Sequence, residues 1–141
     1  MVDDALRLTA GRMRARLFSG LDAKPEQDRA EVVLKRYLST AHRDDREGGC
    51  PFPAVIGEVA TTAPEHAGAL AEQVDAFALE LNALLPTNEE LSKRHLAIGL
   101  FALMYGGLGL ARATRGTDLS DEVIKACRAF GRFALDPKKN P

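Results

Sequence analysis

Apolar residues recur at intervals of three and four along most of the chain, which is the spacing of one face of an α-helix. Residues 2–18 carry such a stripe, and further stripes run through residues 25–38, 53–60, 64–85 and 120–135. The alternation of apolar and polar residues that is typical of a half-buried strand does not occur. The pattern predicts an all-α protein with about six helices and no sheet.

The longest apolar stretch, residues 96–111, has sixteen positions without a charge. A membrane span needs roughly 20 apolar residues, so this stretch is predicted to be a core helix that is buried all round. We expect one helix over residues 88–115, with Thr87 and Glu90 as a capping box at its start. In the same way, Ser120 is expected to cap the last helix.

Small residues form one stripe of this central helix. Gly99, Ala102, Gly106 and Gly109 are spaced by three and four positions. Such a stripe lets a second backbone approach closely, often across a symmetry axis. Bulky residues on other faces of the same helix have the character of a cavity lining or of a filled core, and these two interpretations stay open.

Length, charge and cysteine usage limit the class of protein. The 141 residues are the length of one domain, so residues 1–141 are treated as a single unit. Residues 48–92 contain seven acids and no Lys or Arg, whereas residues 93–141 contain nine basic residues and four acids. These two segments are expected to attract each other. The start of the chain does not resemble a signal peptide, and the cysteines lack metal-site spacing, so we expect a cytoplasmic protein with reduced thiols and no membrane contact.

Motifs for metal, nucleotide or nucleophilic chemistry are not found in the sequence. We therefore expect no cofactor, no metal and no enzymatic activity. One loop leaves an alternative open, because His42, Asp44, Asp45 and Cys50 lie close together in the sequence. A small helical enzyme or metal-binding protein would use these residues, whereas a purely structural loop would hydrogen-bond them locally and bury the thiol.

The same region carries a family resemblance. The residues Tyr37-Leu38-Ser39, His42-Arg43-Asp44-Asp45, Gly49-Cys50-Pro51 and Gly57-Glu58-Val59-Ala60 resemble the C-terminal half of TetR-family transcriptional regulators. The resemblance implies the effector-binding and dimerisation domain of a repressor. In that family the last two long helices pair with their two-fold mates in a four-helix bundle, and a cavity among the middle helices binds a small, often apolar ligand.

The resemblance also implies how such a domain reaches DNA. In the family, an N-terminal head with a helix-turn-helix contacts DNA, and the sequence pattern contains no such head. DNA is therefore expected as a partner only through a missing head. A third interpretation is an interaction or antagonist module without a head, which pairs with a full-length relative.

Family architecture and periodicity together give two sets of candidate residues. The expected ligand-binding residues are Tyr37, Phe52, Phe77, Phe101, Met104 and Tyr105. The expected homodimer interface comprises Gly99, Ala102, Gly106, Gly109, Val123, Cys127 and Phe130.

Overall fold

The computed structural model describes residues 2–87 and 90–136, and no strand occurs in either range. The α-helices are α1 (Val2–Leu17), α2 (Arg29–Tyr37), α3 (Thr40–Asp44), α4 (Phe52–Thr61), α5 (Ala67–Asn82), α6 (Lys93–Ala113) and α7 (Asp118–Leu135), and the 3-10 helices are η1 (Leu21–Ala23), η2 (Glu26–Asp28) and η3 (Pro64–His66). Six of the described α-helices have nine or more residues, and α3 has five. The expectation of an all-α protein with about six helices is confirmed.

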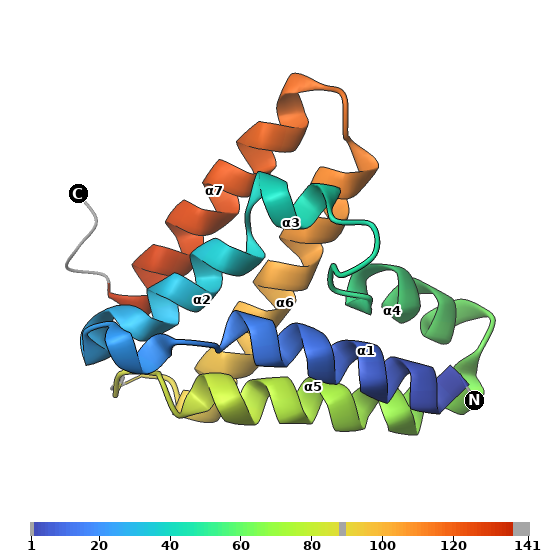
Figure 1. Ribbon diagram of the computed structural model, residues 1–141, viewed down its shortest axis with the longest axis horizontal. Coiled ribbons are helices and arrows are strands. Elements are labelled where there is room, and N and C mark those ends of the chain that lie inside the picture. Colours follow the sequence, from blue (N-terminus) through green and yellow to red (C-terminus); the bar gives the residue numbers. More distant parts are fainter. Residues whose placement is uncertain (1, 88–89, 137–141) are drawn as a thin grey trace.

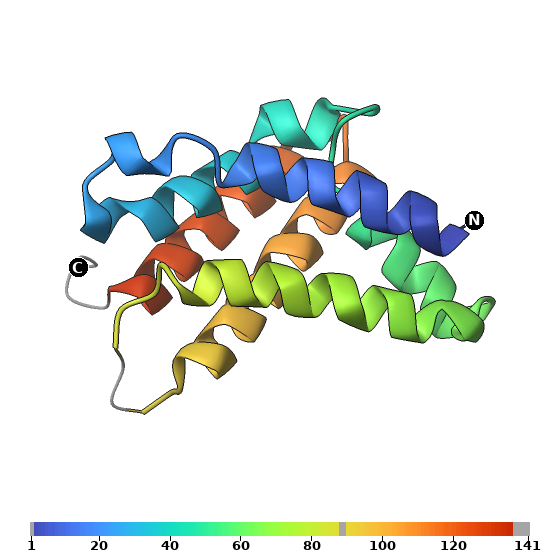
Figure 2. The ribbon, with the colours of Figure 1, turned by 60° about the horizontal axis from the view of Figure 1, so that its bottom comes forward.

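Two long helix pairs organise the chain (Figure 1). Helices α1 and α5 lie side by side, while α6 and α7 form an antiparallel pair joined by a short turn (Figures 1 and 2). Helix α6 also packs against α4 and α5, and α2 packs against α7. The fully buried side chains include Tyr37, Phe52 and Phe77, which come from α2, α4 and α5. One apolar core therefore joins the two pairs.

Ion pairs fix α1 against α5. Arg7 Nε lies 2.8 Å from Glu72 Oε2, and Arg14 Nε lies 3.3 Å from Glu80 Oε1. Two acids of the segment 48–92 are thus paired with arginines of α1. The pair of Arg94 with Asp75, at 2.5 Å, joins the acidic segment to the basic one.

The central helix begins later than the sequence pattern predicts. Of the expected helix 88–115, residues 88 and 89 lie outside the described residues, and Glu90 is not helical. Helix α6 starts at Lys93, because Ser92 caps it by accepting a 3.0 Å hydrogen bond from the His95 backbone N–H. The prediction of a capping box at Thr87 and Glu90 is wrong, because Ser92 caps the helix instead.

The expectation that the central helix is buried all round is also wrong. Gly99, Ala102, Gly106 and Leu110 are exposed along one side of α6, on the same helical stripe. By length and composition α6 is the one helix of residues 2–87 and 90–136 that could cross a membrane, and less than half of its apolar window is buried. The other sides of α6 pack against α4, α5 and α7.

Ser120 does not cap the last helix. Helix α7 begins at Asp118, with Thr117 at its N-cap position, so Ser120 lies inside the first turn. Its buried hydroxyl donates a 2.6 Å hydrogen bond to the Ala111 carbonyl near the end of α6. Ser120 therefore links α7 to α6. The serine that the sequence pattern assigned to a helix start makes a contact between two helices instead.

A glycine sets the distance between α6 and α7. A Cβ placed on Gly107 would lie 2.8 Å from Cys127 Sγ in α7 and 3.1 Å from Leu38 Cδ2. Both distances are shorter than ordinary van der Waals contact, so a larger residue would push the helices apart. The sequence pattern picked out Gly106 and Gly109 on either side of this position and missed the glycine that this contact requires.

We predict that Gly107→Ala lowers the free energy of unfolding by about 1–3 kcal/mol, because overpacking forces side chains and backbone to shift. The matched control is Gly11→Ala, in the middle of α1, where the nearest atom to the new Cβ is 3.9 Å away. The free energy of unfolding of that variant should rise by about 0.5–1 kcal/mol, because alanine has a higher helix propensity than glycine. Urea unfolding of both variants measures the difference, and equal stabilisation by both would contradict the account of the α6–α7 contact.

Candidate functional site

The six expected ligand-binding residues meet in one cluster. Ring centroids lie 5.0 Å apart for Phe77 and Phe101, 5.1 Å for Phe52 and Phe101, and 5.6 Å for Phe101 and Tyr105. Tyr37 joins the cluster through Phe77 at 6.2 Å. Met104 is buried in the same core, and Tyr105 is half-buried at its edge. The surface pockets found on the described residues, the most voluminous one included, are lined by other side chains, so these rings fill the core and do not line an open hollow.

The seven expected dimer residues divide between two environments. Gly99, Ala102 and Gly106 are exposed on α6, and Phe130 of α7 is 66% exposed. Gly109, Val123 and Cys127 have partners within the chain. A Cβ on Gly109 would lie 3.2 Å from Pro53, Val123 is buried, and Cys127 is half-buried beside Gly107.

More apolar residues extend the exposed side of this helix pair. Of nine large hydrophobic side chains that are exposed in the described ranges, Ile98, Leu110, Leu119, Phe130 and Phe133 all lie on α6 or α7. Leu119, exposed Ala126, Phe130 and Phe133 share one side of α7, because their spacing is seven, four and three residues. The opposite side of α7 packs on α2. We name Gly99, Ala102, Gly106, Leu110, Leu119, Ala126, Phe130 and Phe133 the outer face.

The loop between α2 and α4, residues 38–51, contains the short helix α3 and is built around His42. Its Nδ1 lies 2.7 Å from the Tyr37 carbonyl oxygen, and its Nε2 accepts a 2.9 Å hydrogen bond from the Cys50 backbone N–H. The first contact requires a hydrogen on Nδ1 and the second a lone pair on Nε2, so these bonds need the neutral ring. Burial is the main cause that lowers the pKa of His42 from its ordinary value of 6.5, and the Arg112 and Arg16 guanidinium groups act in the same direction. The hydrogen bond to the Tyr37 carbonyl and the charge of Asp45 oppose this shift in the pKa of His42 without cancelling it.

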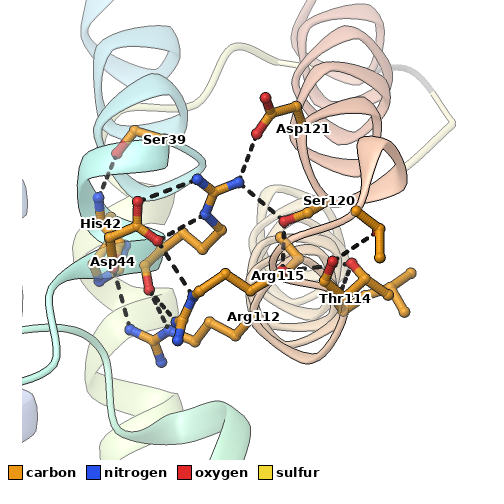
Figure 3. A network of polar contacts seen from close by, with 12 residues as sticks. Ser39, His42, Asp44, Arg112, Thr114, Arg115, Ser120 and Asp121 are labelled. Carbon is orange, nitrogen blue, oxygen red and sulfur yellow. Dashed lines mark hydrogen bonds and ion pairs between the residues drawn. The ribbon is translucent and has the colours of Figure 1, made fainter.

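Arginines from α6 and α7 donate hydrogen bonds to the carbonyl groups of this loop, and Figure 3 shows Arg112 of α6 beside it. Arg112 donates to the carbonyl oxygens of Cys50 at 2.9 Å and His42 at 3.3 Å. Arg128 donates to the carbonyl of Leu38 at 2.5 Å. In a helix or sheet, backbone N–H groups would donate to these carbonyl oxygens, and here the arginine side chains donate to them. The loop is therefore attached to the same two helices that carry the outer face.

Arg43 completes the link from the opposite direction. It lies in α3 and donates to Ser120 Oγ at 3.0 Å and to Asp121 Oδ1 at 2.6 Å, both in α7. Asp44 accepts from Arg43 at 2.9 Å and lies 3.3 Å from Arg115 Nε (Figure 3). The two arginine partners hold the pKa of the Asp44 carboxyl below its usual range.

The residues of the metal or enzyme alternative each have a structural partner. Asp45 accepts a 2.8 Å hydrogen bond from the Gly48 N–H and lies 3.5 Å from Arg16 Nη1. The Cys50 thiol accepts a 3.0 Å hydrogen bond from the Tyr37 hydroxyl, and burial raises the pKa of the thiol to about 11. Within residues 2–87 and 90–136, no three His, Cys, Asp or Glu side chains are grouped to hold a metal ion. The loop of the structure thus has the contacts of the purely structural interpretation.

Comparison of the chain with protein-family models and with curated proteins gives no match.

We predict that acid destabilises the protein through His42. Because its pKa is lower in the folded protein than the unfolded value of 6.5, the unfolded chain binds the proton more readily. The contribution of the neutral ring is complete above pH 6.5 and is lost as the pH falls below that value. Urea unfolding between about pH 7.5 and about pH 5 should show decreasing stability, and His42→Asn should flatten this dependence.

At neutral pH, His42→Asn should itself cost about 1–3 kcal/mol, since two backbone groups lose a partner. The control is His95→Asn, which changes an exposed histidine at the start of α6 and should keep the wild-type pH profile. An unchanged profile in His42→Asn would contradict the role of the neutral ring.

The Cys50 thiol should be inert in the folded state. In a Cys127→Ser background, we expect a thiol-specific reagent at about pH 8 to label Cys50 only in molecules that have opened, because a buried thiol with a raised pKa offers little thiolate. At a reagent concentration where labelling outpaces refolding, the labelling rate should match the rate at which the protein unfolds in the same conditions. Labelling as fast as that of a free cysteine would support the nucleophile hypothesis instead.

Proposed function

We propose that the chain is the effector-sensing, dimerising domain of a TetR-like transcriptional repressor in the cytoplasm. The proposal combines the resemblance of residues 37–60 with one structural observation, the apolar outer face on α6 and α7. A repressor of this kind contacts DNA through a helix-turn-helix head outside the domain. The domain itself holds two such heads at a spacing that depends on its own conformation.

The outer face supports the homodimer. Its glycines leave room for another backbone, since a Cβ on Gly99 or Gly106 has no atom within 4 Å. Phe130 and Phe133 flank this small stripe with large apolar groups, 66% and 49% exposed. A two-fold pairing would bury both kinds of side chain at once, and burial of apolar area is the main favourable contribution to such association.

The arginine bonds suggest how an effector would act. Arg43, Arg112 and Arg128 connect the loop after α2 to α6 and α7. A ligand that favours one position of α2 and this loop would thereby favour one arrangement of the two outer helices. The mechanism is a population shift between two dimer geometries, and it requires the ligand to bind them with different affinity.

A small apolar effector among the six core residues remains part of the proposal. Tyr37, Phe77 and Phe101 are in edge or tilted contact, so a ligand would have to separate packed rings. Half-buried Tyr105 offers the entry, because it lies at the edge of the cluster beside Phe101. A ligand in this position contacts α2, α4, α5 and α6 together.

Two outer-face variants test the dimer. Gly106→Leu adds a side chain where the monomer has open space, and Phe130→Glu places a charge on a ring that is 66% exposed. Neither change disturbs the core of one chain, so each should leave the fold intact and weaken association at least about tenfold, as expected for loss of a central apolar contact. Analytical ultracentrifugation measures the effect.

Matched controls lie on α5. Gly68→Leu adds the same side chain at an exposed helical glycine with no atom within 4 Å, and Leu79→Glu replaces a leucine that is 68% exposed. Both should sediment like the wild type. If the wild type is monomeric, or if all four variants remain dimeric, the proposed dimer is wrong.

A further inference from the structure

The segment between α3 and α4 is attached to the rest of the chain largely at Cys50. Residues 45–51 have no helix. The Cys50 N–H donates to His42 Nε2 at 2.9 Å, and its carbonyl oxygen accepts from Arg112 at 2.9 Å. Its thiol accepts from the Tyr37 hydroxyl at 3.0 Å. A segment that is held mainly at one residue can separate from the fold at a lower free energy than a packed helix.

The bond between Cys50 and His42 exists only while the ring is neutral. Nδ1 of the ring lies 2.7 Å from the Tyr37 carbonyl oxygen and must carry a hydrogen, because a carbonyl oxygen only accepts. The lone pair on Nε2 is therefore the one that receives the Cys50 N–H, and it is also the place where the ring takes up a proton. Once Nε2 is protonated, two N–H groups face each other at hydrogen-bond distance and have to separate.

The charged groups around the ring favour this separation. Burial, Arg112 of α6 and Arg16 of α1 all hold the pKa of His42 below its ordinary value. Arg36 of α2 lines the same hollow of about 220 Å³, through which the ring meets solvent. Asp45 is the acid that faces the ring, but it already accepts from the Gly48 N–H at 2.8 Å. A proton that reaches Nε2 through the hollow thus enters a site that disfavours a cation.

We propose that residues 45–51 and His42 form an acid-operated latch, in which a proton on His42 Nε2 releases the segment while the helices stay folded. The opening exposes the Cys50 thiol, which is buried in the closed latch, and it frees Arg112 from the Cys50 carbonyl. Release differs from the acid unfolding predicted above, because the helices keep their packing. The latch lies within one chain and acts whether or not the proposed dimer and effector site exist.

Access of a reagent to the Cys50 thiol measures the opening of the latch. In the Cys127→Ser background, 4,4′-dithiodipyridine labels Cys50 in acid as well as at neutral pH. At low reagent concentration, the labelling rate divided by that of N-acetylcysteine at the same pH follows the fraction of open molecules. Because one proton is taken up on opening, this ratio should approach a rise of about tenfold for each pH unit below 6.5.

Urea separates release of the latch from unfolding of the whole chain. Release exposes little surface, so at about pH 5.5 the labelling rate should change less than about twofold on adding about 1 M urea. Labelling through global unfolding would rise more than about fivefold under the same conditions. Far-ultraviolet circular dichroism of the wild type should stay constant over the pH range of the labelling experiment.

Two histidine variants assign the response to one ring. His42→Gln removes the titrating group and keeps an oxygen that can accept from the Cys50 N–H, so its normalised labelling rate should not depend on pH. The matched control is His66→Gln, at a half-buried histidine that lies 2.6 Å from Asp3 and outside the latch, and it should keep the wild-type response.

The latch is wrong if the normalised labelling of the wild type does not rise in acid, or if urea accelerates it as steeply as global unfolding requires. Both of these measurements use the wild-type latch and do not depend on the folding of a histidine variant. A response that survives in His42→Gln, or that is lost in His66→Gln, would assign the proton to another group and also overturn the proposal.

Discussion

The close approach of α6 and α7 at Gly107 is the constraint on which the rest of the fold depends. Gly107 has no side chain, so Cys127 of α7 and Leu38 at the end of α2 both pack directly against α6. Gly131 of α7 allows a similar close approach between α7 and α2, because a Cβ there would lie 2.8 Å from Leu34 in α2. Three helices thus meet at two glycines, and the pair α6–α7 is left with one side inside the core and one side outside.

The loop between α2 and α4 follows from the same arrangement. Outside the short helix α3, carbonyl groups of this loop need donors other than helix backbone, and Arg112 and Arg128 supply them from the helix pair. His42 holds the two ends of the loop together by bonding the backbone of Tyr37 and Cys50. The polar residues of the loop are therefore used for architecture, and they connect α2 mechanically to the helices that carry the outer face.

Helix number and type could be predicted from apolar periodicity, because each helix buries one stripe of its surface. The start of α6 could not, since Thr87–Glu90 and Ser92 both carry N-cap signals and only tertiary structure selects between them. Ser120 shows the same limit, because a serine hydroxyl serves a helix start or a neighbouring carbonyl equally well. The small stripe was found, but periodicity does not say which glycine faces a partner helix and which faces outward.

The predicted functional residues show the same limit of apolar periodicity. The six ligand candidates do come together, yet a packed aromatic core and a cavity lining use the same residues at the same spacing. Of the expected dimer residues, Gly99, Ala102, Gly106 and Phe130 are exposed, whereas Gly109, Val123 and Cys127 contact their own chain.

The central claim is that the exposed small stripe of α6 meets the same stripe of a second copy. A disulfide scan tests it most directly, with single cysteines at positions 99, 102 and 106 in a Cys127→Ser background. Two helices that cross at a two-fold axis bring one position opposite itself within disulfide distance, roughly 4–7 Å between Cα atoms. The account predicts a covalent dimer on mild oxidation for at least one of these positions and none for Gly68→Cys. Failure of all three to cross-link, or equal cross-linking at position 68, would contradict it.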